Sequence, residues 1–127
     1  MQRAEANNYY PHLMASKLAI DGSTAAATDL DFIAGATLAT HTPVFAIITY
    51  GSGTLGVCDI DIKADTVIMD TALLTTLTAT ESKIKKSLSK TDDAFTNDPA
   101  LFMNVTVGNP SAGASTFNVY IYGIELN

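Results

Sequence analysis

The sequence is short of charge. Only 16% of its 127 residues are Asp, Glu, Lys or Arg, against about 25% in an average soluble domain. Alanine and threonine stand in many places where lysine and glutamate usually form a solvated surface. A small protein of this composition dissolves poorly unless neighbours cover part of it. We therefore expect a domain that partner molecules partly bury.

Basic residues are the scarcer of the two charged classes. Seven Lys and Arg stand against 13 Asp and Glu, which gives a net charge of −6. Sequence-independent binding to nucleic acid needs a basic face that displaces counterions from the phosphates. We therefore expect no nucleic-acid partner.

Cysteine occurs once, so no disulfide can form within the chain. Around it, "VCDIDI" alternates, placing Cys58, Ile60 and Ile62 on one face of a strand and Asp59 and Asp61 on the other. No base lies nearby in the sequence to activate a nucleophile. This pattern predicts that Cys58 is a buried thiol serving as a small apolar residue.

Long apolar runs are absent. The stretch from Phe32 to Cys58 carries no charge, but Pro43, glycines and hydroxyl residues interrupt it and "VFAII" is its longest apolar run. A membrane-spanning helix needs about 20 predominantly apolar residues. The first twenty residues also lack the apolar core of a signal peptide. We expect neither a membrane segment nor a secretion signal.

Metal-binding motifs are not apparent. The pairs Asp29 with Asp31 and Asp59 with Asp61 each put two carboxylates on one side of a strand, and two further aspartates at 65 and 70 could add oxygen ligands for Ca²⁺. Because none has EF-hand spacing, solvated strand faces are the favoured interpretation and a metal site the minor alternative. We predict no metal and no cofactor.

Catalytic motifs are missing too. The two histidines, His12 and His41, accompany no nucleophile-elbow pattern, and "YGSGTLG" lacks the ending of a phosphate-binding loop. An enzyme would require the fold to gather His41 with acids in a pocket. The sequence predicts no catalytic residue and a protein that is not an enzyme.

Alternating apolar residues indicate strands in both halves of the chain. "LFMNVTV" and "FNVYIYGIEL", between Leu101 and Leu126, each carry one apolar face, and the small-residue loop between them predicts a hairpin. "PVFAIITYGSGTLGVCDIDIKA" predicts a second hairpin, turning at residues 51–53. Strands of this kind without a βαβ rhythm predict an all-β antiparallel sandwich or barrel.

The segment from Asp70 to Lys90 is ambiguous. Leu73 and Leu77 have helical spacing and Asp70 could cap a helix, whereas the threonines favour extended structure. We expect a helical turn over 70–77 and a strand over 82–88.

Residues 1–20 show no sustained strand or helix period, so we expect an N-terminal arm there and one β-sandwich domain over 21–127. Tyr9 and Tyr10 are large contact groups of the kind that interfaces favour. They could equally pack on their own domain.

The lysines concentrate in "KIKKSLSK". Lys83, Lys85 and Lys86 there form a basic patch on an acidic protein, which suits docking on an acidic surface. A strand edge blunted by lysines explains them as well.

"LFMNVTVGNPSAGASTFNVYIYGIEL" resembles the closing strands of small structural proteins of tailed bacteriophages, and "LDFIAGATLATHTPVFAIITYGSGTLGVCDIDI" is similar to the same group's central pattern. The resemblance covers about half of the chain. It implies a jelly-roll-like β-sandwich that acts as a capsid decoration, or cement, protein.

That resemblance also implies a setting. Such a protein is made in the host cytoplasm, assembles as a homotrimer and binds the major capsid protein on the outside of the virion. Tyr120, Tyr122 and Ile124 are the residues we expect against a neighbouring subunit. A tail-fibre tip or a carbohydrate-binding module is the alternative function.

Overall fold

Strands form almost all of the regular structure. The computed structural model describes residues 10–55, 58–64, 67–74, 77–88, 101–107 and 115–125, and it contains no α-helix among them. The strands are β1 (His12–Asp21), β2 (Ala26–Asp29), β3 (Asp31–Phe32), β4 (His41–Ser52), β5 (Asp59–Ala64), β6 (Val67–Leu73), β7 (Lys83–Ser87), β8 (Leu101–Val107) and β9 (Thr116–Glu125). The predicted all-β class is confirmed.

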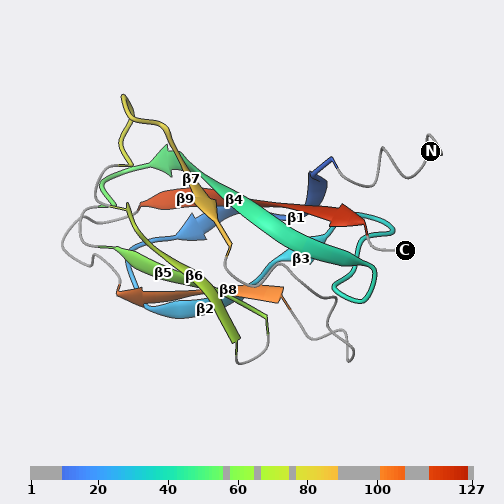
Figure 1. Ribbon diagram of the computed structural model, residues 1–127. Coiled ribbons are helices and arrows are strands. Elements are labelled where there is room, and N and C mark those ends of the chain that lie inside the picture. Colours follow the sequence, from blue (N-terminus) through green and yellow to red (C-terminus); the bar gives the residue numbers. More distant parts are fainter. Residues whose placement is uncertain are drawn as a thin grey trace.

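The strands form two antiparallel sheets that pack as two layers (Figure 1). One sheet has five strands in the order β3-β1-β9-β4-β7, and the other has four in the order β2-β8-β5-β6. Strand β9 is therefore central in the first sheet, where it pairs with β1 on one side and β4 on the other. The molecule is a β-sandwich.

Alternation along the strands fills the space between the layers. In β5, Ile60 and Ile62 are buried, whereas Asp59, Asp61 and Lys63, which alternate with them, are only half-buried. Strand β9 repeats the pattern with Phe117, Val119 and Ile121. Each such side chain contributes about 1.5–3 kcal/mol when it leaves water, so these inward rows supply the main stabilisation of the fold.

The strand pairs are nested along the chain. Strand β1 pairs with β9, β2 with β8, β4 with β7, and β5 with β6. The first half of the chain thus lies antiparallel to the second half, pair by pair. Each sheet contains two of these pairs side by side. The two-residue β3 adds to the edge of the five-stranded sheet, next to β1.

Both predicted hairpins are wrong. Strands β8 and β9 belong to different sheets, and so do β4 and β5, so each connection crosses between the layers. Alternation predicted the strands and the inward positions Leu101, Met103 and Val105 correctly. It carries no information about which strand lies alongside, because every strand of a sandwich shows the same period of two.

The N-terminal arm predicted for residues 1–20 is wrong from His12 onward. Residues 12–21 form β1, which lies between β3 and β9 and buries Met14, Ala15 and Ile20. Register shifts interrupt its pairing with β9, and Ala19 has a φ of 57° within one of them. These bulges break the alternation that would reveal a strand. Residues 1–9 lie outside the described residues.

The helical turn predicted over 70–77 is wrong for its first half. Residues 67–73 form β6, which pairs with β5, and Leu74 and Leu77 follow it as buried side chains. Leu74 has 3₁₀ conformation, and its carbonyl accepts a hydrogen bond of 3.0 Å from the Leu77 N–H, so helical geometry is confined to the end of the predicted segment. The strand predicted over 82–88 is confirmed as β7.

Candidate interaction face

Half-exposed aromatic and branched side chains gather on the outer surface of the five-stranded sheet. Along β9, the residues between the buried ones point outward. The register places Phe45 and Leu13 opposite Tyr122, and Ile47 opposite Tyr120. Directly opposed residues of antiparallel strands share a face. The group is termed the aromatic face and consists of Leu13, Phe45, Ile47, Tyr120, Tyr122 and Ile124.

Two rings of the aromatic face stack across neighbouring strands. The ring centroids of Phe45 and Tyr122 are 4.9 Å apart and their planes differ by 13°. That distance matches the roughly 4.8 Å between neighbouring strands. Two rings lying flat on the sheet would collide at this spacing, so the rings stand up from it in a stacked pair. The ring faces that meet in the stack are therefore covered within the chain.

Lys85 completes this stack from the edge of the sheet. Its Nζ lies 4.4 Å from the centroid of the Phe45 ring. Because β7 and β9 flank β4 on opposite sides, Lys85 and Tyr122 approach opposite faces of that ring. A cation over an aromatic face contributes about 0.5–1 kcal/mol at an exposed site. The ammonium group is thereby held at the border of the aromatic face.

The other lysines of β7 point in two directions. Lys83, two residues from Lys85, lies on the same side of the strand and pairs in register with Thr49. Lys86 points to the other side, and its Nζ lies 3.8 Å from Oδ2 of Asp70 on β6. This ion pair links the edge strands of the two sheets. Lys83 and Lys85 therefore border the aromatic face, and Lys86 does not.

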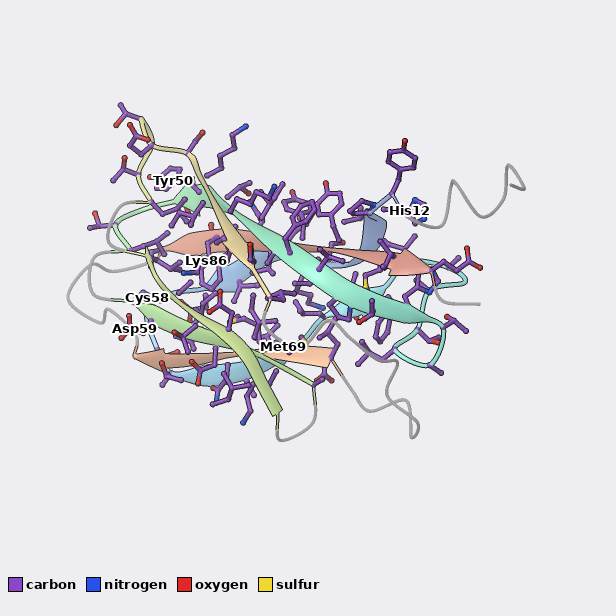
Figure 2. The ribbon with its side chains drawn as sticks, viewed as in Figure 1. His12, Tyr50, Cys58, Asp59, Met69 and Lys86 are labelled. Atoms are coloured by element: carbon purple, nitrogen blue, oxygen red, sulfur yellow. The ribbon has the colours of Figure 1, made fainter. Side chains whose placement is uncertain are left out.

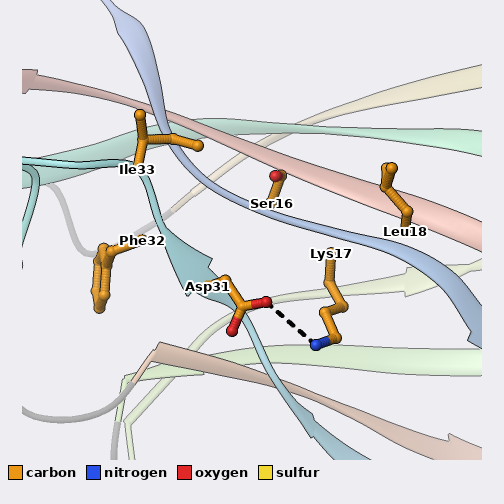
Figure 3. Close-up of a pocket in the computed structure, with 6 residues that line it drawn as sticks. All are labelled: Ser16, Lys17, Leu18, Asp31, Phe32 and Ile33. Atoms are coloured by element: carbon orange, nitrogen blue, oxygen red, sulfur yellow. Dashed lines mark hydrogen bonds and ion pairs between the residues drawn. The ribbon is translucent and has the colours of Figure 1, made fainter.

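A shallow pocket of about 340 Å³ lies at the opposite edge of the same sheet. Ser16 and Leu18 of β1 and Ile33, which follows β3, project from one side of the sheet, and Lys17 of β1 projects from the other (Figure 3). Nζ of Lys17 is 3.1 Å from Oδ2 of Asp31. Leu18 is 59% exposed and Ile33 is 41% exposed. Apolar surface thus continues past Leu13 to this edge.

The outer surface of the four-stranded sheet is polar by comparison. Asp59, Asp61 and Lys63 alternate along β5, and Asn104 and Thr71 lie opposite Asp61. Among the described residues, no three His, Cys, Asp or Glu side chains are close enough together to hold a metal ion. Asp65 lies outside the described residues. The two outer surfaces of the sandwich therefore differ in chemistry.

The histidines lie apart from any acidic cluster in the described part of the chain. His12 is exposed at the start of β1 (Figure 2). Nδ1 of His41 lies 2.8 Å from Oγ1 of Thr40, its neighbour in sequence. The register of β4 and β9 places Glu125 opposite His41.

Five of the eight residues predicted at an interface lie on or beside the aromatic face, whereas Lys86 pairs with Asp70 instead. Tyr120, Tyr122 and Ile124 lie on the aromatic face, with Lys83 and Lys85 along its border. Tyr10 is 68% exposed and precedes β1, whereas Tyr9 lies outside the described residues. The sequence prediction missed Leu13, Phe45 and Ile47, although alternation within "FAIIT" could have placed the last two on one face.

Cys58 is fully buried beside the start of β5, as predicted (Figure 2). Burial, followed by the negative charges of Asp59 and Asp21, raises the pKa of this thiol from 9.0 to about 11. Below pH 9 the thiol is protonated in the folded and the unfolded chain alike. At higher pH the unfolded chain loses the proton first, so stability falls as the pH rises toward 11.

We expect Cys58 to resist alkylation by iodoacetamide at pH 8. The raised pKa leaves about 100-fold less thiolate than in the unfolded chain, and burial excludes the reagent as well. Mass spectrometry should detect almost no adduct in buffer and complete modification in guanidinium chloride. Equal rates in the two conditions would contradict the buried position.

No described helix is sufficiently long and apolar to cross a membrane. Comparisons with known proteins found no matching family model, no matching curated protein and no matching solved structure. The geometry and chemistry of the aromatic face are therefore the observations that bear on its function.

Proposed function

We propose that this chain is a structural virion protein: a decoration, or cement, protein of a tailed bacteriophage. It binds the outside of the head and stabilises contacts between major capsid subunits. The observation that carries this proposal is the aromatic face, where side chains of the three strands β1, β4 and β9 leave apolar surface without a covering element among the described residues. A continuous exposed apolar surface of this kind is typical of protein interaction sites.

The size of the sheet supports a stable contact. Strand β9 has ten residues, which span about 33 Å at a rise of about 3.3 Å per residue. Neighbouring strands are about 4.8 Å apart, but β3 has only two residues and β7 only five, so the outer surface of the sheet covers about 600 Å². That area approaches the roughly 800 Å² that one partner buries in a standard protein interface.

The nested strand pairs support the finer fold in this proposal. Eight strands in two sheets, paired first with last and inward from there, follow the order of a jelly roll. Viral capsid proteins and lectins share this architecture. Fold alone does not identify a function, so the chemistry of the aromatic face decides between these two kinds of partner.

A protein partner fits the aromatic face better than a glycan. A sugar ring stacks on the flat face of an aromatic side chain. On this surface, Tyr122 and Lys85 occupy the two faces of the Phe45 ring. The edge of the Phe45 ring remains, and it suits contacts with side chains of another protein. Selective binding on a glycan array would reverse this preference in favour of a carbohydrate-binding module or tail-fibre tip.

A cement protein needs no catalytic site, and the proposal assigns none to this chain. Binding to the assembled head stabilises it by mass action, because the protein favours the intact shell over dissociated subunits. Repetition by symmetry multiplies each contact. In this scheme the chain is made in the host cytoplasm and joins the head as a homotrimer.

The test is addition to heads that lack their decoration protein. We expect the purified protein to co-sediment with expanded, undecorated heads of tailed phages, to saturate at a fixed number of copies per capsid subunit, and to raise the temperature at which the heads break open. Failure to bind any head, or binding without saturation, would contradict the proposed function.

A further inference from the structure

The charge along the border of the aromatic face is opposite in sign to the net charge of the whole chain. The net charge of −6 by itself predicts a basic partner. Along β9, β4 and β7, all of whose residues the structure describes, the outward positions carry Lys83 and Lys85, and the one carboxylate of these strands, Glu125, is exposed at the end of β9. A partner that meets this surface therefore meets positive charge.

Several nearby carboxylates have other partners or lie on another surface. Asp70 faces Lys86, and Asp31 faces Lys17. Asp59 and Asp61 lie on the outer surface of the other sheet. Glu81 is exposed in the bend before β7, and Glu125 is exposed at the end of β9. Among the described residues, the charges at the outward strand positions of this surface are therefore those of Lys83 and Lys85.

Lys85 is arranged to bind an anion. Contact with the Phe45 ring fixes one side of its ammonium group, which has three N–H donors. Because the side chain is already held in place, a carboxylate that binds there orders little additional structure. Lys83, on the same side of β7, offers a second donor group to the same strip of a partner.

We infer that the aromatic face recognises an acidic protein surface, in which apolar side chains meet Phe45 and Tyr122 and carboxylates meet Lys83 and Lys85. This inference rests on the proposed function, for which it specifies the partner chemistry: the contacted region of the major capsid protein is acidic. Each lysine then aids association and excludes partners of basic charge.

The first experiment uses charge reversal on undecorated heads. The variant Lys83→Glu/Lys85→Glu should bind at least about tenfold more weakly than the unchanged protein at 50 mM salt. Raising the salt to 300 mM should weaken the unchanged protein severalfold and the variant little. The control Lys63→Glu alters the outer surface of the four-stranded sheet and should bind as the unchanged protein does. Thermal unfolding confirms that all three proteins are folded.

The second experiment needs no capsid. Surface plasmon resonance measures adsorption on one monolayer with mixed methyl and carboxylate end groups and another with mixed methyl and trimethylammonium end groups. Although the chain is acidic, we expect the unchanged protein to bind the methyl/carboxylate surface. The Lys83→Glu/Lys85→Glu variant should lose most of that binding, and Lys63→Glu should keep it.

The two experiments separate the two proposals. If heads bind the unchanged protein and its charge-reversed variant equally, the acidic partner is wrong and the proposed function stands. If heads bind neither but the carboxylate monolayer binds through the lysines, the acidic partner stands and the proposed function is wrong. Absence of lysine-dependent binding in both experiments overturns the inference.

Discussion

Tyr122→Ala is expected to weaken binding to undecorated heads by about 30- to 100-fold while the protein stays folded. Tyr122 lies on the central strand of the five-stranded sheet, between Phe45 and Leu13. Aromatic side chains at the centre of an interface typically cost 2 kcal/mol or more when truncated, and that energy corresponds to the stated loss. Loss of the stack with Phe45 should lower the free energy of unfolding by only about 1 kcal/mol.

The matched control is Ile68→Ala. Ile68 is also a large exposed side chain, at 50%, but it lies on β6 of the other sheet. Co-sedimentation isotherms should show unchanged affinity for this control. Equal losses for the two variants would show that binding does not depend on the aromatic face, and an unchanged affinity of Tyr122→Ala would exclude this residue from the contact.

Phe117→Ala is expected to have the opposite profile, with a loss of about 3–5 kcal/mol in the free energy of unfolding. Phe117 lies on the same strand as Tyr122 but points inward, where it is fully buried. It faces the Ile20 and Tyr50 positions of the two flanking strands. Truncation leaves a cavity that packed neighbours cannot collapse to fill. Stabilities of small domains are about 5–15 kcal/mol, so a large share would be lost.

Denaturation in guanidinium chloride measures this effect, with Phe117→Leu as the graded control. The leucine variant should lose about 1–2 kcal/mol, because it fills much of the same volume. A similar, small loss for both variants would contradict a tightly packed site. Variants that remain folded should bind heads as the unchanged protein does, because Phe117 does not reach the outer surface.

Alternation predicted the interior of the sandwich well. Cys58, Ile60 and Ile62 point inward as expected, and so do Val119 and Ile121. This success has a physical basis, since successive side chains of any strand point to opposite faces and burial selects apolar residues. The same regularity explains the wrong hairpins, because it does not distinguish a neighbour in sequence from a neighbour in the sheet.

The candidate site could be predicted only in part. Tyr120, Tyr122 and Ile124 share a face because they alternate along one strand, which the sequence displays directly. The stack of Lys85, Phe45 and Tyr122 depends on the order β7-β4-β9. That order joins three segments far apart in the chain, and no local pattern encodes it. Leu13 could not be predicted for a different reason: bulges interrupt the alternation along β1.

The central position of β9 also governs how the chain folds. Until this final strand is in place, β1 and β4 lack their shared neighbour, and the five-stranded sheet remains in two pieces. Pairing of the first strand with the last requires closure of nearly the whole chain, and such non-local topologies fold in milliseconds to seconds. A nascent or truncated chain therefore cannot complete its core. A chain that ends before β9 therefore presents no complete five-stranded sheet for a partner to bind.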